Sequence, residues 1–212
     1  MRTVAIVQAR MGSTRLWGKV LRSLSPYRLV IEEVLRRAQQ IPGVDEVGCA
    51  IADTIEDQAL ERAVSGMGIW TMHGPESDVL KRYALAADRL DADIIVRITA
   101  DCPLLNPQVC GDLIALRERL DAGYASNAWP ARSFAHGEDC EVFTRDVLDR
   151  ADHEATAPSD REHVCPWMQR QPDIKKAFLK AMEDRSHLRW TLDTDEDLEV
   201  IRGVFKQMRE SA

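Results

Sequence analysis

The chain has 212 residues, of which 45% are hydrophobic and 30% charged, and these shares fit a single folded domain spanning residues 1–212. Its formal net charge of -7 disfavours a general nucleic-acid coat or a membrane-surface binder, because both would be basic. It has no apolar run of the roughly 20 residues that a bilayer span needs, and its five scattered cysteines form no Cys-x-x-Cys pair. We therefore expect a cytoplasmic protein with no nucleic-acid and no membrane partner.

Strand and helix patterns alternate along the first 120 residues, where short apolar runs predict strands and helically spaced apolar residues predict helices. In chain order these are a strand at 4–7, a helix at 29–40, a strand at 47–51, a helix at 53–64, a strand at 69–72, a helix at 77–90, a strand at 93–98 and a helix at 107–120. Such alternation implies parallel βαβ units, and so an α/β fold with a doubly wound, mostly parallel sheet flanked by helices. Ligands of such sheets lie beyond the carboxyl ends of the strands.

The second half of the chain has a weaker pattern. Two short apolar runs predict strands at 140–143 and 176–179, and at about 124–185 we expect a small irregular insertion that contains β-structure. An apolar stripe predicts a C-terminal helix that starts at about Asp195, with Thr194 as its N-cap.

The segment 8–19, directly after the first strand, combines glycine, hydroxyl groups and positive charge. The glycine is Gly12, the hydroxyl groups belong to Ser13 and Thr14, and the positive charges are those of Arg10, Arg15 and Lys19. Backbone N–H groups at a glycine, with hydroxyls and cations beside them, predict a cradle for phosphate; the alternative is a solvated basic loop. A Walker A motif is excluded, because five residues separate Gly12 from Gly18 and Val20 follows the lysine. Residues 1–37 carry a net charge of +6 and the rest of the chain -13, so one small anion can bind here.

Two carboxylates from distant segments are candidates for a metal site. Asp101 follows the strand at 93–98, and Asp193 lies just before the C-terminal helix. Carboxylates at the ligand edge of an α/β sheet can hold Mg²⁺ against phosphates. Alternatively, Asp101 caps the next turn, and whether Asp193 or Asp195 is the second ligand stays open.

A turn at 74–78 precedes the helix predicted at 77–90. Its amides and polar side chains could contact a base. The alternative is that Ser77 is the N-cap of that helix and Arg82 a surface charge.

These motifs together resemble the cytidylyltransferase family, which includes acylneuraminate cytidylyltransferases and CMP-Kdo synthetases. The resemblance is strongest to its spore-coat polysaccharide biosynthesis branch. It rests on the segments 8–16, 18–21, 78–83, 97–104, 124–127, 139–143, 161–164 and 189–194. These segments occur in order along nearly the whole chain.

The resemblance implies a nucleotide-diphospho-sugar transferase-like, Rossmann-like fold. It also implies Mg²⁺-dependent transfer of CMP from CTP to a sugar acid, with release of pyrophosphate, for surface polysaccharide biosynthesis. The nucleotide-binding residues that it implies are Gln8, Ala9, Arg10, Gly12, Ser13, Arg15, Lys19, Gly74, Ser77 and Asp78. The resemblance implies that Mg²⁺ is bound by Asp101 and Asp193. The residues that it implies to be catalytic are Arg10, Arg15, Lys19 and Asp101. The residues implied to face the sugar are Asn127, Asp139, Glu141, Arg161 and His163.

The sequence departs from the family pattern at several places. Trp17 stands where the family usually has proline, residues 25–28 replace a Gly-Gly-Lys-Pro turn, Asp195 replaces a frequent proline, and Glu138 and Cys140 are unusual neighbours of Asp139. Two other functions therefore stay open: a nucleotide-sugar-dependent glycosyltransferase of the same fold, and a non-catalytic nucleotide-binding module. His163 is a possible general base. The resemblance also makes a homodimer possible, with an interface around residues 127–161.

Overall fold

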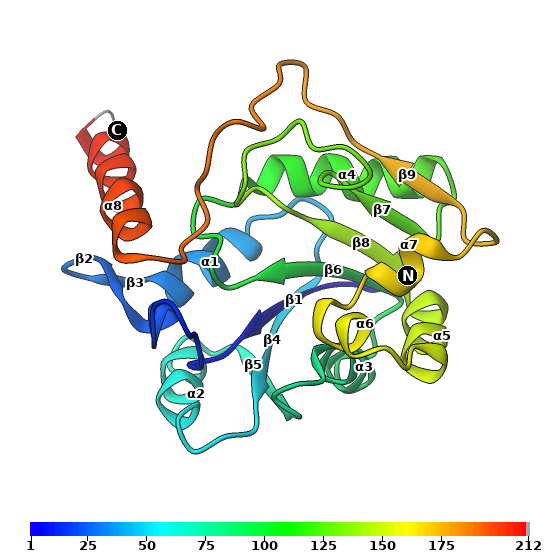
Figure 1. The fold of residues 1–212 in the computed structure, drawn as a ribbon, viewed down its shortest axis with the longest axis horizontal. Coiled ribbons are helices and arrows are strands. Elements are labelled where there is room, and N and C mark those ends of the chain that lie inside the picture. Colours follow the sequence, from blue (N-terminus) through cyan, green and yellow to red (C-terminus); the bar gives the residue numbers. More distant parts are fainter. Residues whose placement is uncertain (211–212) are drawn as a thin grey trace.

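The computed structural model, which describes residues 1–210, contains a seven-stranded sheet with the strand order β5-β4-β1-β6-β8-β7-β9 (Figure 1). Its strands are β1 (Thr3–Ala9), β4 (Glu46–Ala52), β5 (Trp70–Gly74), β6 (Ile94–Thr99), β7 (Tyr124–Ser126), β8 (Glu141–Thr144) and β9 (Lys176–Phe178). The first four are mutually parallel, β8 runs antiparallel to β6 and β7, and β9 is parallel to β7. A separate hairpin pairs β2 (Ser23–Ser25) with β3 (Arg28–Leu29). The carboxyl ends of β1 and β6 therefore lie side by side in the middle of the sheet.

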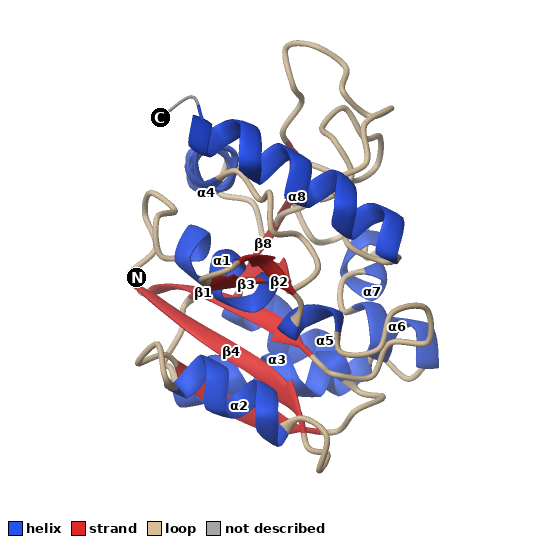
Figure 2. Cartoon of the chain, turned by 90° about the vertical axis from the view of Figure 1, so that its left-hand side faces the viewer, coloured by secondary structure: helices blue, strands red, loops and turns tan. Residues whose placement is uncertain are grey.

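Helices cover both faces of this sheet. One face carries α1 (Val30–Ala38), α2 (Gln58–Ser65) and α4 (Pro107–Arg119). The other carries α3 (Val79–Arg89), α5 (Arg145–Glu154) and α7 (Pro166–Arg170), with the short α6 (Pro158–His163) beside α3. The last helix, α8 (Asp195–Glu210), lies outside these layers, next to the β2–β3 hairpin (Figure 2).

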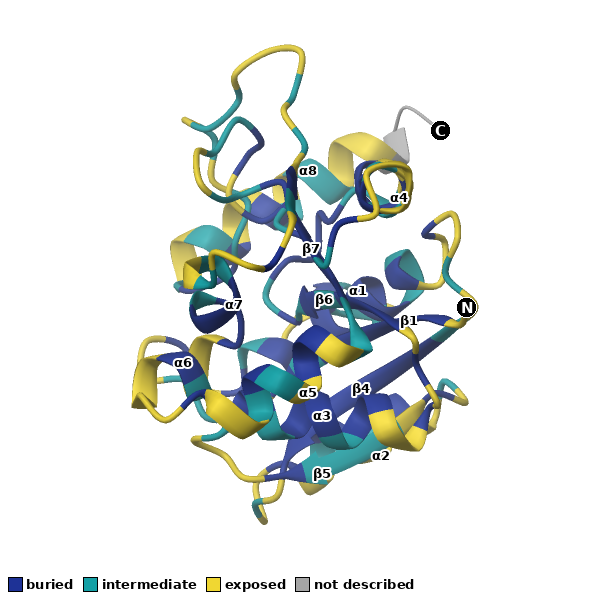
Figure 3. Ribbon diagram, turned by 90° about the vertical axis from the view of Figure 1, so that its right-hand side faces the viewer, coloured by how far each residue is buried: buried dark blue, intermediate teal, exposed yellow. Residues whose placement is uncertain are grey.

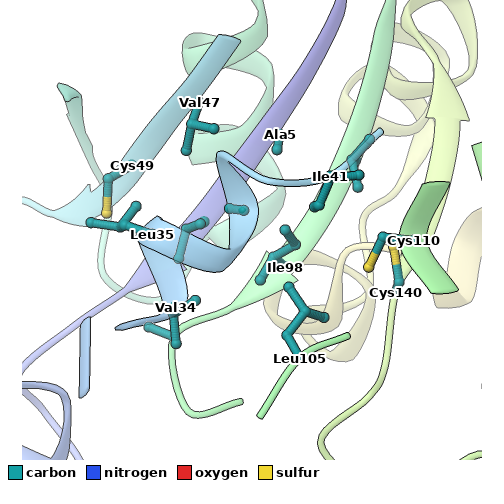
Figure 4. Close-up of a cluster of buried hydrophobic side chains, with 14 of the residues drawn as sticks. Ala5, Val34, Leu35, Ile41, Val47, Cys49, Ile98, Leu105, Cys110 and Cys140 are labelled. Carbon is teal, nitrogen blue, oxygen red and sulfur yellow. The ribbon is translucent and has the colours of Figure 1, made fainter. Parts of the chain in front are cut away.

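Successive residues of β1 alternate between two buried clusters. Ala5 and Val7 pack with the α1 face, and Val4 and Ile6 pack with the α3 face; all four are fully buried. In Figure 4, Leu35 of α1 lies next to Cys49 of β4. Figure 3 shows the same pattern, with buried strands inside helices whose outer sides are exposed. A strand buried on both faces reads as a continuous apolar run, which is why the sequence indicates these strands clearly.

The predicted fold class is confirmed, and four strands and three helices of the first half lie close to their predicted positions. The helix predicted at 53–64 was placed too early, since it begins at Gln58. The residues before it form a turn, in which the Thr54 hydroxyl donates a hydrogen bond to Asp57. The β2–β3 hairpin, β7 and helices α5, α6 and α7 were not predicted from the sequence, because they are short or lack a clear apolar period.

The C-terminal helix starts at Asp195, as predicted. The Asp197 amide donates to the Thr194 hydroxyl, while the Thr194 amide donates to the Asp197 carboxylate, which forms a reciprocal cap. Leu198 and Ile201 pack into a third apolar cluster that includes Leu16. Leu16 belongs to the segment 8–19, which we call the glycine loop. This packing places the segment before α8 at the carboxyl edge of the sheet.

Candidate active site

A cavity of about 610 Å³ opens at the carboxyl ends of β1 and β6. Its wall is formed by the glycine loop, the residues that follow β6, the first turns of α3 and the end of α6. Predicted site residues that line it are Gln8, Ala9, Arg10, Gly12, Ser13, Arg15, Lys19, Asp101, His163 and Asp193. The structure therefore brings together most of the predicted nucleotide and metal residues in a volume typical of a ligand pocket.

The glycine loop is held by a hydrogen bond within the loop and by another to Asp57. The Gly18 amide donates to the Met11 carbonyl at 3.0 Å, and Gly18 has a φ of 66°, a left-handed conformation that favours glycine. The Met11 amide donates to Asp57 at 2.6 Å. Asp57 is 1% exposed, and its link to the glycine loop was missed because a carboxylate before a helix is typical of a cap.

Lys19 holds the two predicted metal ligands together. Its Nζ donates to Asp101 at 2.8 Å, to Asp193 at 2.9 Å and to the Leu192 carbonyl at 2.8 Å. Burial lowers the pKa of Lys19, but the Asp101 charge and the hydrogen bonds to both carboxylates outweigh it and raise this pKa above its usual value. Burial opposes the charge of Asp193 too, yet hydrogen bonds from Lys19 and Arg189 hold the pKa of Asp193 below its usual value.

The donor set at Lys19 fits a hard divalent cation. Asp101 and Asp193 offer carboxylate oxygens to one point, and the segments that carry them are tied by a bond from the Leu192 amide to the Asp101 carbonyl. Of the two candidates for the second ligand, it is Asp193 that lines the cavity. Within residues 1–210, no group of three metal-ligating side chains occurs. Mg²⁺ fits such a pair, because it commonly binds one or two carboxylates and completes its shell with phosphate oxygens and water.

A second set of charges lies at the other end of the cavity, on the α3 face of the sheet. Arg97 ion-pairs with Glu141 of β8, and its Nε donates to the Gln8 amide oxygen at 3.2 Å. The Tyr124 hydroxyl donates to Glu141 at 2.5 Å. Burial and the Glu141 charge both raise the pKa of Tyr124. This network is neutral overall and fixes the orientation of the Gln8 side chain.

The residues predicted to face the sugar fall into separate places. His163 lines the cavity, whereas Glu141 is held in the Arg97 network. Asn127 is 1% exposed and closes the following loop, with its amide bonded to the Glu138 carbonyl and the Cys140 amide. Asp139 pairs with Arg132. Arg161 pairs with Asp78 and Asp152 between α3, α5 and α6. Their roles toward a substrate stay predictions.

The three nucleotide residues predicted near α3, Gly74, Ser77 and Asp78, are not among the residues that line the cavity. The Asp78 side chain caps α3 by accepting from the Lys81 amide at 2.9 Å, so the alternative of a Ser77 cap was wrong. Gly74 ends β5 and packs against the stem of Arg82. Arg82 is only 1% exposed, so the alternative of a surface charge at this position was wrong as well.

A mostly parallel sheet with a basic glycine loop after its first strand, facing two carboxylates, is the architecture of a nucleotidyltransferase. The family model described as Cytidylyltransferase matches residues 4–211, and the chain belongs to this family. The spore coat polysaccharide biosynthesis protein SpsF of Bacillus subtilis is 31% identical over 214 residues, which cover 97% of this chain and 87% of that protein.

Solved structures agree with this assignment. A cytidylyltransferase from Leptospira borgpetersenii superposes with a TM-score of 0.89 at 30% identity, covering 95% of this chain and 85% of that one. A CMP:2-keto-3-deoxy-manno-octonic acid synthetase complexed with CTP shares the fold, with a TM-score of 0.75, 21% identity, and 98% and 100% coverage. The predicted family and enzyme class are thus confirmed. Within the described chain, no helix is both long and apolar enough to cross a bilayer.

Proposed function

We propose that this protein transfers CMP from CTP to a hydroxyl group of a sugar acid and releases pyrophosphate. The observation that carries the proposal is the contact of Lys19 with both Asp101 and Asp193, opposite the amides of the glycine loop. Family membership supports nucleotidyl transfer, and the structural relative complexed with CTP supports the choice of nucleotide.

The reaction needs positioning and charge neutralisation more than covalent help from the protein. A hydroxyl oxygen of the sugar attacks the α-phosphorus, forming a new O–P bond, while the bond from the α-phosphorus to the bridging oxygen of the β-phosphate breaks. Arg10, Arg15 and Lys19 line the cavity and would balance the charge of the triphosphate. Amides of the glycine loop would bind its oxygens.

The metal belongs to this proposal as well. Asp101 and Asp193 would hold Mg²⁺, which supplies additional neutralisation of phosphate charge when bound. Lys19 already holds both carboxylates close together before the metal binds, so little free energy is needed to bring them together.

The proton of the attacking hydroxyl needs an acceptor. His163 lines the cavity at the end of α6, and histidine is the side chain that most often serves as a general base. We keep His163 as the candidate general base.

The experiment is a nucleotide panel followed by a turnover assay. Melting temperature is measured with CTP, UTP, ATP, GTP and CMP, with and without Mg²⁺, since a bound ligand raises apparent stability. Pyrophosphate release is then measured with CTP, Mg²⁺ and a panel of sugar acids. The proposal predicts a preference for CTP and release with at least one sugar acid. Binding of CMP equal to that of CTP would favour a glycosyltransferase, and binding of CTP without turnover on a broad panel would favour a non-catalytic module.

The proposal extends to cellular location and assembly. All five cysteines are buried free thiols, which supports a reducing compartment such as the cytoplasm. A homodimer through residues 127–161 is the proposed assembly, and light scattering on the purified protein tests it. A monomer at all concentrations would contradict the proposed homodimer.

A further inference from the structure

Arg82 of α3 is a buried arginine in the wall of the cavity. It is 1% exposed, and its Nη1 donates to the Ala9 carbonyl at the end of β1, at 3.2 Å. Its stem packs on Gly74 at the end of β5, where a Cβ would lie 2.8 Å from the Arg82 Cγ. Glycine at position 74 therefore makes room for the path of this side chain into the cavity wall.

The guanidinium of Arg82 is only partly satisfied by the protein, through its bond to the Ala9 carbonyl. Its Nε is buried and has no hydrogen-bond partner among the residues that the structure describes. Arg117 on α4, by contrast, is also buried and its Nε donates to the Ala122 carbonyl at 2.8 Å. Leaving a buried charged donor without a partner is costly, so Arg82 is expected to meet a ligand group.

The strand order places the Arg82 side chain on the β5 side of β1 and Asp101 on the β6 side. β5 and β6 lie on opposite sides of β1, with β4 between β5 and β1. Asp101, which holds Lys19, follows β6, whereas the Arg82 side chain runs from Gly74 at the end of β5 to the Ala9 carbonyl at the end of β1. A nucleotide whose phosphates lie at Lys19 and whose base points toward β5 would place that base beside Arg82.

We propose that Arg82 binds the O2 and N3 atoms of the cytosine ring and thereby selects CTP over UTP, an inference that rests on the proposed function. The Nε–H and the neighbouring Nη–H of a guanidinium are parallel donors that match two adjacent acceptors. Cytosine offers acceptors at both O2 and N3. Uracil carries a hydrogen on N3, so one donor would then face another donor.

The first test compares Arg82→Gln with Arg117→Gln, the same change at a buried arginine outside the cavity. Dissociation constants for CTP and UTP are measured by calorimetry on each protein. We expect the wild type to prefer CTP, and Arg82→Gln to weaken CTP binding by about 10-fold to 100-fold with little change for UTP. Arg117→Gln should keep the wild-type ratio. An equal loss for both nucleotides would assign Arg82 to the phosphates, and an unchanged ratio would make it structural; either result overturns the inference.

A second test avoids the risk that Arg82→Gln fails to fold. Wild-type protein is titrated with CTP and with 3-deaza-CTP, in which a C–H group replaces N3. We expect 3-deaza-CTP to bind about 10-fold or more weakly. Equal binding of the two overturns the role of Arg82 while leaving the proposed function intact. If instead the wild type binds neither CTP nor UTP, the proposed function itself fails.

Discussion

The two ends of the cavity differ in how their charged side chains are paired. At the end proposed to bind the nucleotide, called the nucleotide end and formed by residues 8–19 with Asp101 and Asp193, Arg10 makes no ion pair in the described chain, while Arg15 and Lys19 pair with these carboxylates. At the end proposed to face the acceptor, called the acceptor end and formed by Arg97, Glu141 and their neighbours, the positive charge of Arg97 is matched by a carboxylate of the protein. The first end therefore keeps a cation that a ligand anion can pair with, whereas the second end is balanced before any substrate binds.

This difference suggests that the two ends of the cavity have different functions. Excess positive charge attracts a triphosphate and neutralises it. A balanced polar network gives little attraction but holds its groups in fixed orientations, as Arg97 does for the Gln8 amide. Changes at the nucleotide end should therefore affect turnover first, and changes at the acceptor end should affect stability first.

The largest effect is expected for Asp101→Ala. This change removes one carboxylate from the proposed Mg²⁺ site and one partner of Lys19. We expect kcat/KM to fall by at least about 1000-fold, because several kcal/mol of charge stabilisation are lost in the transition state. Pyrophosphate release measures it. The control is Asp112→Ala, on α4 outside the cavity, which should keep its activity; normal activity of Asp101→Ala would remove the metal assignment.

The next effect concerns the acceptor end and is one of stability. Glu141→Gln leaves the half-buried Arg97 guanidinium without its countercharge. We expect the free energy of unfolding to fall by about 3 kcal/mol, as for other broken buried ion pairs. Urea unfolding measures it. The double variant Arg97→Gln/Glu141→Gln, which carries no net charge, should recover part of this loss; a single variant as stable as the wild type would contradict the balanced network.

Lys19→Ala returns to the nucleotide end. It removes the cation that lies between two carboxylates and beside the expected phosphates. We expect kcat/KM to fall by about 100-fold, near 2–3 kcal/mol, similar to the loss of one donor in an oxyanion site. The control is Lys206→Ala on the exposed side of α8. If the two variants turn over equally, Lys19 acts only as a structural contact.

Much of the nucleotide end could be predicted from the sequence because its groups are local. Residues 8–19 supply glycine, hydroxyls and cations within one segment. The strand before this segment can be identified from its apolar run and its position. Asp101 and Asp193 come from distant segments, and the sequence predicted that they face each other across the site, but not that Lys19 bonds to both.

The residues that the sequence did not reveal act through contacts that cross the fold. Asp57 supports the Met11 amide from another βα unit, and a surface position was kept as an alternative for Arg82 because a charge on an amphipathic helix is normally solvated. The acceptor end depends on β7 and β8, whose pairing with β6 is antiparallel and non-local. Ion pairs such as Arg161 with Asp78 join residues far apart in the chain, so spacing alone gave no sign of them.

The smallest effect expected is a dependence on pH. The pKa of Asp193 is below its unfolded value, so its ion pairs stabilise the protein fully above the unfolded pKa and lose this contribution as the pH falls through the folded pKa. The pKa of Lys19 is raised, so its contribution is lost only at alkaline pH. The stability gap between wild type and Lys19→Ala should therefore be present at pH 7 and narrow below about pH 4. Urea unfolding at pH 7 and pH 3 measures both gaps. Lys206→Ala should show no such narrowing, and a Lys19 gap that stays constant would mean that burial, rather than its ion pairs, sets the contribution of this lysine.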